Sequence, residues 1–239
     1  MLTTGLCYSP IVVRAIDTKG LGRRFGRHWA VAHCDLEVTE GETLLIAGPN
    51  GSGKTTLLRL CATLLRPTRG HLRIFDHDPT SEPLACRRLL TLVGHDNYLY
   101  HQLTALETLR LWSRLSDFSG PNTDLKQLLE MVDLGEWADT VVAGFSAGMK
   151  KRLTFLRARL EEPRLVLLDE PFSALDTAGQ ALIESWVGEF QAAGKTVAIA
   201  SHNFAKAGPL CDRAVYIDQG QVVWSGPPAE LESIQGSTA

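Results

Sequence analysis

The chain has 239 residues, 44% of them hydrophobic, which is enough for the core of a single α/β domain spanning residues 1–239. Its formal net charge of −3 excludes a general electrostatic attraction for nucleic acid, so we expect no nucleic-acid partner. The five scattered cysteines include no C-x-x-C pair, which favours reduced core thiols over a zinc site.

Antiparallel strands are expected at both ends of the chain. Residues 12–16 and 31–38 suit two strands around the apolar run that follows them, and residues 213–218 and 221–224 suit a hairpin turned at Gln219-Gly220. Two short basic runs, Arg23-Arg24-Phe25-Gly26-Arg27 and Lys150-Lys151-Arg152, are interpreted as solvated faces or as positions next to a phosphate.

A glycine-rich segment, Gly48-Pro49-Asn50-Gly51-Ser52-Gly53-Lys54-Thr55, fits the spacing G-x-x-x-x-G-K-[ST] and is followed by Thr56. In this pattern backbone N–H groups wrap a polyphosphate, lysine reaches the terminal phosphates and the hydroxyl of Thr55 takes Mg²⁺. An apolar run at 42–47 suits a buried strand before the segment, and a helical pattern at 55–65 follows it until Pro67. Strand, glycine loop and helix N-terminus together predict a P-loop that binds ATP or GTP.

The middle of the chain, from residue 103 to about residue 159, has a helical apolar pattern. One face carries Leu106, Leu109, Trp112 and Leu115, and a second pattern follows at Leu125, Leu128, Leu129 and Val132. We interpret residues from about 95 to 159 as a helical subdomain. It is inserted into a nucleotide-binding core of about 10–94 and 160–230.

Two further apolar runs, at 165–168 and 196–200, end on the polar pairs Asp169-Glu170 and Ser201-His202. Near-continuous Val, Ile and Leu runs predict strands of a parallel sheet, which holds its ligand at the carboxyl ends of the strands. Asp169 is then placed to hold Mg²⁺ directly or through water, and Glu170 to orient or deprotonate the attacking water. The alternative for this acidic pair is a solvated turn or a helix N-cap.

The segment Phe145-Ser146-Ala147-Gly148-Met149 lies between the P-loop and Asp169-Glu170 and is similar to the LSGGQ signature. With these motifs, nearly the whole chain resembles an ABC-type ATPase, the nucleotide-binding subunit of a membrane transporter. The resemblance implies a P-loop NTPase (RecA-like) core with an antiparallel β subdomain and an inserted helical subdomain. It also implies a head-to-tail dimer, in which Ser146 and Gly148 of one subunit contact the γ-phosphate on the other subunit's P-loop.

The resemblance implies further roles residue by residue. His202 matches the switch histidine, a partner of the γ-phosphate and of the Glu170 region, and Ser173-Ala174-Leu175-Asp176 resembles the D-loop. Phe25 lies where the family stacks an aromatic ring on adenine, and Trp29 is the alternative platform.

The chain departs from the family at two positions. A glutamine near Mg²⁺ is replaced either by His95 or by Asp96, and Met149 replaces the last residue of the signature. Asp96 can ligate Mg²⁺ through oxygen, whereas neutral His95 can accept a hydrogen bond from a metal-bound water. The sequence leaves this choice open.

The implied cofactors are ATP and Mg²⁺, and the implied partners are a polytopic membrane permease and a second ATP-binding subunit, as a homodimer. No apolar stretch is long enough to cross a bilayer, so we expect a peripheral protein at the cytoplasmic face of the inner (plasma) membrane. It reaches the membrane only through the permease. Tyr98, Leu99, Tyr100 and Trp112 are candidate contacts with that partner, or core residues.

The cargo is predicted from short motifs alone. Gly94-His95-Asp96 and Leu103-Thr104-Ala105-Leu106-Glu107 most resemble the ATP-binding subunit of the heme exporter used in cytochrome c maturation. Exporters of lipid, polysaccharide or drug carry similar strings and stay open as alternatives. A soluble ABC ATPase would usually carry two cassettes or a long coiled coil, and a P-loop kinase or GTPase would leave Ser146, Glu170 and His202 without roles.

Overall fold

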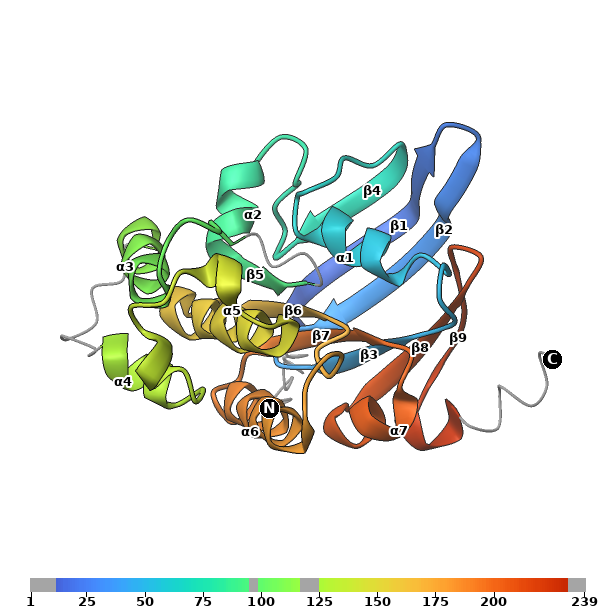
Figure 1. Cartoon of the computed structure of the whole chain (residues 1–239). Coiled ribbons are helices and arrows are strands. Elements are labelled where there is room, and N and C mark those ends of the chain that lie inside the picture. The colour runs from blue at the N-terminus through green and yellow to red at the C-terminus, as the bar shows by residue number, and fades with distance from the viewer. Residues whose placement is uncertain (1–11, 95–98, 117–124, 232–239) are drawn as a thin grey trace, which may run out of the picture.

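One mixed β-sheet organises the molecule (Figure 1). The computed structural model describes residues 12–94, 99–116 and 125–231, and its strands lie in the order β4-β1-β2-β9-β8-β3-β7-β6-β5. Neighbouring strands from β8 to β5 are parallel, whereas β4, β1 and β2 pair antiparallel at the other end. The expected α/β class and the expected antiparallel β part are confirmed.

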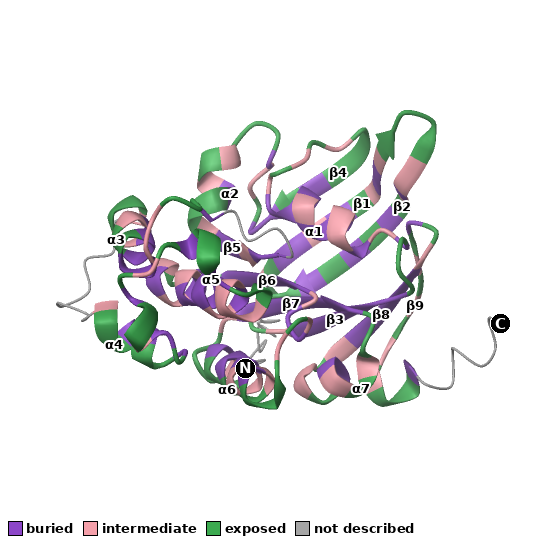
Figure 2. Cartoon of the chain, viewed as in Figure 1, coloured by how far each residue is buried: buried purple, intermediate pink, exposed green. Residues whose placement is uncertain are grey.

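The parallel strands form the buried centre of the sheet. Their bounds are β3 (Thr43–Ala47), β5 (Leu90–Val93), β6 (Leu165–Asp169), β7 (Thr196–Ser201) and β8 (Arg213–Asp218). Alternate side chains leave the sheet on opposite faces, so Leu44 and Ile46 of β3 join one hydrophobic cluster and Leu45 and Ala47 join another. Figure 2 shows these strands as the most buried part of the molecule, because the helices and the antiparallel strands cover both faces.

The antiparallel part consists of β1 (Arg14–Phe25), β2 (His28–Thr39) and β4 (Arg69–Ile74). The strands expected at 12–16 and 31–38 exist, but they pair with each other, and the strand before the P-loop pairs with β7 and β8 instead. β1 and β2 are also longer than the two expected strands. The β1–β2 ladder contains register shifts, and these irregularities let two twelve-residue strands twist without losing their pairing.

The helix after the P-loop, α1 (Lys54–Cys61), is shorter than the expected 55–65. Thr63 takes a positive φ of 62°, and the N–H groups of Leu64 and Leu65 both donate to the carbonyl of Arg59, which closes the helix end. Leu64 is 47% exposed. The apolar pattern beyond Cys61 therefore does not reflect a continued buried helix face.

The described residues between β5 and β6 contain three α-helices, as the helical pattern in the middle of the chain predicts: α3 (Ala105–Leu115), α4 (Leu125–Glu130) and α5 (Ala147–Glu161). In α3, Leu106, Leu109 and Trp112 are buried, whereas Leu115, which shares their face in the sequence pattern, is 72% exposed at the helix end. Trp112 is a core residue and not a surface contact. Leu99 is buried, whereas Tyr100 is 58% exposed and remains a candidate contact.

The C-terminal part confirms the expected hairpin. β8 and β9 (Gln221–Gly226) pair antiparallel, and Gln219 and Gly220 turn the chain with φ values of 45° and 76°. The turn touches the P-loop, because the Gly220 N–H donates to the carbonyl of Ser52 at 2.9 Å. The other α-helices in the described part of the chain are α2 (Pro83–Leu89), α6 (Thr177–Ala192) and α7 (Phe204–Ala207).

Candidate functional site

The sheet order brings the predicted polar segments together. β3, β7 and β6 are consecutive and parallel, so the P-loop, Ser201-His202 and Asp169-Glu170 all leave the same edge of the sheet. Strands buried on both faces hold these carboxyl ends in fixed positions. The sequence-based expectation that the three segments reach one edge of the sheet is confirmed.

Two glycines of the P-loop are required by close backbone contacts. Gly48 has φ 148°, and a Cβ there would lie 2.2 Å from the carbonyl oxygen of Ile217. Gly53 has φ 109°, and a Cβ there would lie 2.2 Å from the carbonyl oxygen of Ala30. Both positions exclude any side chain, so the loop stays tight enough for its N–H groups to point at one ligand.

The P-loop also contains a buried hydroxyl that has no partner in the described part of the chain. Ser52 is 4% exposed, and its Oγ makes no hydrogen bond there. A buried polar atom of this kind costs free energy unless a ligand satisfies it. A phosphate oxygen within the glycine loop is such a ligand, so the residues present fit a nucleotide polyphosphate.

Lys54 supplies a cation inside the loop. Its Nζ donates to the carbonyl oxygens of Gly48 at 2.8 Å and Pro49 at 2.9 Å. Burial lowers the pKa of Lys54, and the neighbouring carboxylates of Glu170 and Asp169 oppose that shift. The ammonium therefore lies in an electronegative, dehydrated setting and can transfer its hydrogen bonds to phosphate oxygens.

Thr55 and Asp169, the two residues predicted to bind Mg²⁺ together, lie in direct contact. The Thr55 Oγ1 donates to Asp169 Oδ1 at 3.0 Å, and Asp169 is 4% exposed. Burial raises the pKa of Asp169, while the hydrogen bond from Thr55 opposes the shift. A hydroxyl and a carboxylate beside a phosphate loop are the oxygen ligands that Mg²⁺ prefers, so the donor set fits this ion.

Glu170 is held by the residues that end β7. Its Oε1 accepts from the backbone N–H of His202 at 3.0 Å and lies 2.8 Å from His202 Nδ1, and its Oε2 accepts from Ser201 Oγ at 3.2 Å. The backbone of Glu170 has a positive φ of 50°, which is rare for a residue with a side chain. The expected proximity of Glu170 and His202 is therefore found, and Ser201 adds a contact that the sequence did not indicate.

The signature-like segment begins helix α5. Ser146 is the N-cap and its side chain accepts from the Met149 N–H at 3.2 Å. The segment packs on the D-loop-like turn, since a Cβ on Gly148 would lie 2.9 Å from the carbonyl oxygen of Ala174. Within the described residues of this single chain, no hydrogen bond joins Ser146 to the P-loop.

The two candidate adenine platforms differ in their surroundings. Phe25 is 45% exposed at the end of β1, with the Arg23 guanidinium 4.6 Å from its ring centre. Trp29, on β2, lines a cavity of about 500 Å³ together with residues 49–52 of the P-loop, and Phe25 is not among its lining residues. The Arg69 guanidinium lies over the Trp29 ring, with its Cζ atom 4.5 Å from the ring centre.

The structure corrects one sequence-based interpretation and leaves another open. The run Lys150-Lys151-Arg152 is expected to be a solvated face or a phosphate-adjacent position. Lys151 is instead only 4% exposed and donates to the backbone oxygens of Glu170 and Ser173. No sequence signal distinguishes Lys151 from its basic neighbours, because its burial depends on how α5 packs against the turn after Asp169. His95, Asp96 and Tyr98 lie outside the described residues.

The comparisons with known proteins agree with this geometry. The protein-family model described as ABC transporter matches residues 31–173, which is more than half of the chain. The chain belongs to the ABC transporter family. This ABC ATPase is 36% identical over 226 residues to the daunorubicin/doxorubicin resistance ATP-binding protein DrrA of Streptomyces peucetius, covering 94% of this chain and 68% of that protein.

Two more similarities cover most of this ABC ATPase. A fluoroquinolones export ATP-binding protein of Mycobacterium tuberculosis is 32% identical over 234 residues, covering 97% of this chain and 77% of that protein. The dimeric structure of a post-hydrolysis state of an ATP-binding cassette, bound to ADP and Pi, superposes with a TM-score of 0.80 at 26% identity, covering 89% of this chain and 98% of that one.

Family membership makes the chain an ATP-binding and ATP-hydrolysing transporter subunit with the expected ABC fold. Of the two nucleotides that the P-loop pattern allows, the ligand is therefore ATP and not GTP. Over the ranges that the structure describes, no helix combines the length and apolarity of a membrane span.

Proposed function

We propose that this ABC ATPase powers export through a separate polytopic permease, with ATP held between two copies of the chain. The observation that carries the proposal is the single sheet edge shared by the P-loop, Asp169-Glu170 and His202. The similarity to ATP-binding proteins named for drug resistance and drug export supports export as the direction of transport. The chain itself is expected at the cytoplasmic face of the inner (plasma) membrane.

Each residue of the shared edge has one role in this proposal. Residues 48–56 bind the phosphates, and Phe25, or else Trp29, stacks on adenine. Thr55 and Asp169 hold Mg²⁺, which when bound neutralises charge on the phosphates. Glu170 orients and deprotonates the attacking water, and His202 fixes the Glu170 carboxylate through the contact at 2.8 Å.

The proposed dimer completes the site. Ser146 caps α5 at an exposed position, where its hydroxyl and the N–H groups of the helix start are available to a γ-phosphate on the partner's P-loop. The dimeric, ADP- and Pi-bound cassette supports this assembly by analogy. A subunit without its partner should therefore hydrolyse ATP poorly.

The permease selects the cargo, and the relatives favour the drug-like alternative over heme. The string Leu103-Thr104-Ala105-Leu106-Glu107 that suggests a heme exporter is the start of α3. There Thr104 and Glu107 form a capping box, with the Thr104 N–H donating to Glu107 at 2.8 Å and the Glu107 N–H donating to Thr104 at 3.2 Å. Helix capping alone explains these residue types. The heme exporter stays a prediction from short motifs.

Purification of the tagged full-length chain from its own membranes in mild detergent tests the proposal. A stoichiometric polytopic membrane protein, together with ATPase activity that depends on it, is the expected result. Ribosomal material in its place would contradict the transport role. Vesicles containing the complex then distinguish the cargo: MgATP-dependent uptake of an anthracycline supports the drug-like class, and uptake of heme instead supports the short-motif prediction.

The open choice between His95 and Asp96 has its own experiment. In the reconstituted complex, ATPase activity is measured against Mg²⁺ concentration for His95→Ala and for Asp96→Ala. The variant with the altered Mg²⁺ response marks the residue that contributes to the metal site. An unchanged response in both variants would remove this segment from the site.

A further inference from the structure

Lys151 is a buried cation whose hydrogen bonds all go to the turn that follows β6. Its Nζ donates to the backbone oxygen of Glu170, to Ser173 O at 3.1 Å and to Ser173 Oγ at 2.6 Å. Burial lowers the pKa of Lys151 to about 8, and the charges of Glu170 and Asp169 oppose that shift. A lysine buried to this degree is uncommon unless its ammonium is fully used.

The turn that Lys151 holds is conformationally unusual. Glu170 and Ala174 both have positive φ, at 50° and 60°, although neither is glycine. Such residues persist only where surrounding contacts fix them. The Glu170 N–H donates to Ala200 O on β7 at 2.8 Å, and Lys151 holds the Glu170 carbonyl from α5, so the backbone is fixed from both sides.

Helix α5 contacts this turn with one face. Gly148 and Lys151 are three residues apart, which places them on the same side of the helix. Gly148 meets the carbonyl of Ala174, and Lys151 meets Glu170 and Ser173. The helix lies beside the edge of the sheet at β5 (Figure 1). Its N-cap is Ser146, so one helix joins the signature-like segment to the residue that contacts the Glu170 backbone.

We propose that Lys151 is a positioning residue, which couples the signature-like segment to the Glu170 carboxylate. When nucleotide engages Ser146, the first turns of α5 are fixed, and Lys151 fixes the Glu170–Ser173 turn with them. The inference rests on the proposed function, because it needs Glu170 to act on the attacking water and Ser146 to contact nucleotide.

Substitution by methionine separates this role from simple packing. Lys151→Met keeps the length and apolar stem of the side chain and removes the ammonium. The Glu170 carbonyl keeps the N–H of Ser173 at 3.2 Å and its Oγ at 2.9 Å as partners, so the variant is expected to fold. Lys151→Arg restores a cation with several donors. Lys150→Met is the matched control, because the Lys150 side chain makes no hydrogen bond in the described part of the chain.

The experiment measures single-turnover ATP hydrolysis in the permease complex and ATP affinity of the isolated full-length subunit. Loss of a charged hydrogen-bond donor predicts a rate about 10- to 100-fold lower for Lys151→Met. Lys151→Met should keep the wild-type ATP affinity. Lys150→Met should hydrolyse ATP at the wild-type rate, and Lys151→Arg should recover part of the rate that Lys151→Met loses. In the Glu170→Gln background, Lys151→Met should cause no further loss, since it acts through Glu170.

The outcomes distinguish the positioning role of Lys151 from the catalytic role of Glu170. The positioning role is overturned if Lys151→Met hydrolyses ATP at the wild-type rate. It is also overturned if Lys151→Met lowers the rate further in the Glu170→Gln background. Neither result contradicts the ATPase mechanism. A wild-type rate in Glu170→Gln alone overturns both. Reduced ATP affinity in Lys151→Met shows a structural role of the lysine in the P-loop region and also overturns the inference.

Discussion

The contact between Gly148 and Ala174 predicts the effect of adding one methyl group. In Gly148→Ala the new Cβ would lie 2.9 Å from the Ala174 carbonyl oxygen, which is shorter than real contacts of this kind. The oxygen belongs to a backbone with φ 60°, so it cannot rotate away as a flexible side chain would. Either α5 or the turn must move, and the turn carries Glu170.

The matched control is Gly188→Ala in α6, where a Cβ meets nothing within 4 Å. Replacing glycine by alanine in an open helix position stabilises by about 1 kcal/mol. Overpacking at Gly148 costs about 1–3 kcal/mol, which offsets or exceeds any similar gain there. We expect the free energy of unfolding of Gly148→Ala to be lower than that of Gly188→Ala by about 1–3 kcal/mol.

Urea denaturation of the isolated subunit measures this difference, with equal m-values as the check on two-state behaviour. ATP turnover in the permease complex should fall in Gly148→Ala and stay unchanged in Gly188→Ala. Equal stability and equal turnover in the two variants would refute the close packing of the signature-like segment on the turn.

Three further predictions concern the P-loop, Glu170 and Lys151. Glu170→Gln should leave ATP binding intact and lower turnover in the complex by about 10²–10⁴-fold, and an unchanged rate would remove it as the general base. Gly53→Ala should abolish ATP binding, because the new Cβ would lie 2.2 Å from the Ala30 carbonyl oxygen, whereas a Cβ at Gly51 meets no atom within 4 Å, so Gly51→Ala should weaken binding less. Isothermal titration calorimetry measures both affinities, and weaker binding by Gly51→Ala than by Gly53→Ala would contradict the close approach of Gly53 to Ala30. Lys151 has a folded pKa of about 8 against 10.5 when unfolded, so the folded state binds fewer protons between these values. The free energy of unfolding of wild type minus that of Lys151→Met should therefore rise with pH across this window, and a falling difference would contradict the burial of the ammonium.

The sequence predicted the parts of the site that depend on strand ends. Val, Ile and Leu runs followed by Asp169-Glu170 and Ser201-His202 identify buried parallel strands, and parallel strands deliver such residues to one edge. It did not predict which strands pair, because the β1 and β2 patterns fit several neighbours. Pairing depends on contacts between distant segments, which local periodicity does not encode.

Lys151 shows the second limit of sequence reasoning. A lysine between Lys150 and Arg152 has the composition of a solvated face, and only the packing of α5 against the Glu170 turn shows that it is buried. The end of α1 is a related case. Leu64 continues the apolar pattern, but a left-handed Thr63 ends the helix and exposes it. Leu115 is likewise apolar and exposed at the end of α3.

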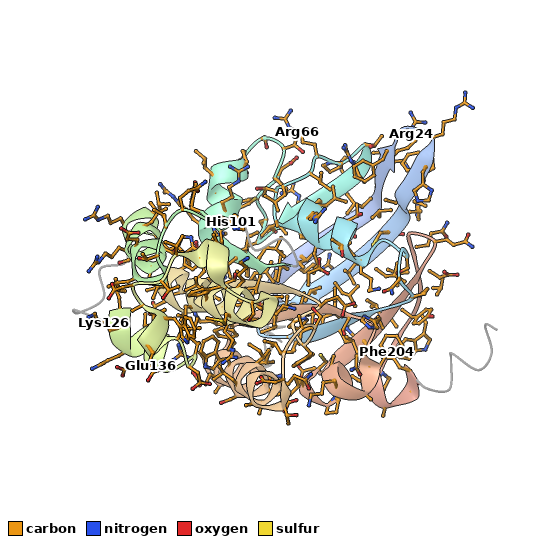
Figure 3. All side chains as sticks on the ribbon, viewed as in Figure 1. Arg24, Arg66, His101, Lys126, Glu136 and Phe204 are labelled. Atoms are coloured by element: carbon orange, nitrogen blue, oxygen red, sulfur yellow. The ribbon has the colours of Figure 1, made fainter. Side chains whose placement is uncertain are left out.

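The basic residues beside the antiparallel strands differ in their surroundings. Arg24 and Arg66 lie at the periphery of this part of the molecule (Figure 3). Arg23 and Arg69 bind backbone carbonyls of the chain itself: Arg23 donates to Arg66 O at 3.1 Å, and Arg69 donates to the Ala32 carbonyl. Arg69 also lies over the Trp29 ring, so its contacts stabilise the fold around Trp29.

We propose that each ATP lies between Lys54 of one subunit and Ser146 of the other. Mixing Lys54→Ala subunits with Ser146→Ala subunits in the permease complex tests it most directly. Each variant alone is inactive, but a mixed dimer has one site with both residues intact if they act across the interface. Equal mixing should then restore roughly a quarter of wild-type ATPase activity, since half of the dimers are mixed and half of their sites are complete. No restoration above the separate variants would contradict the shared site.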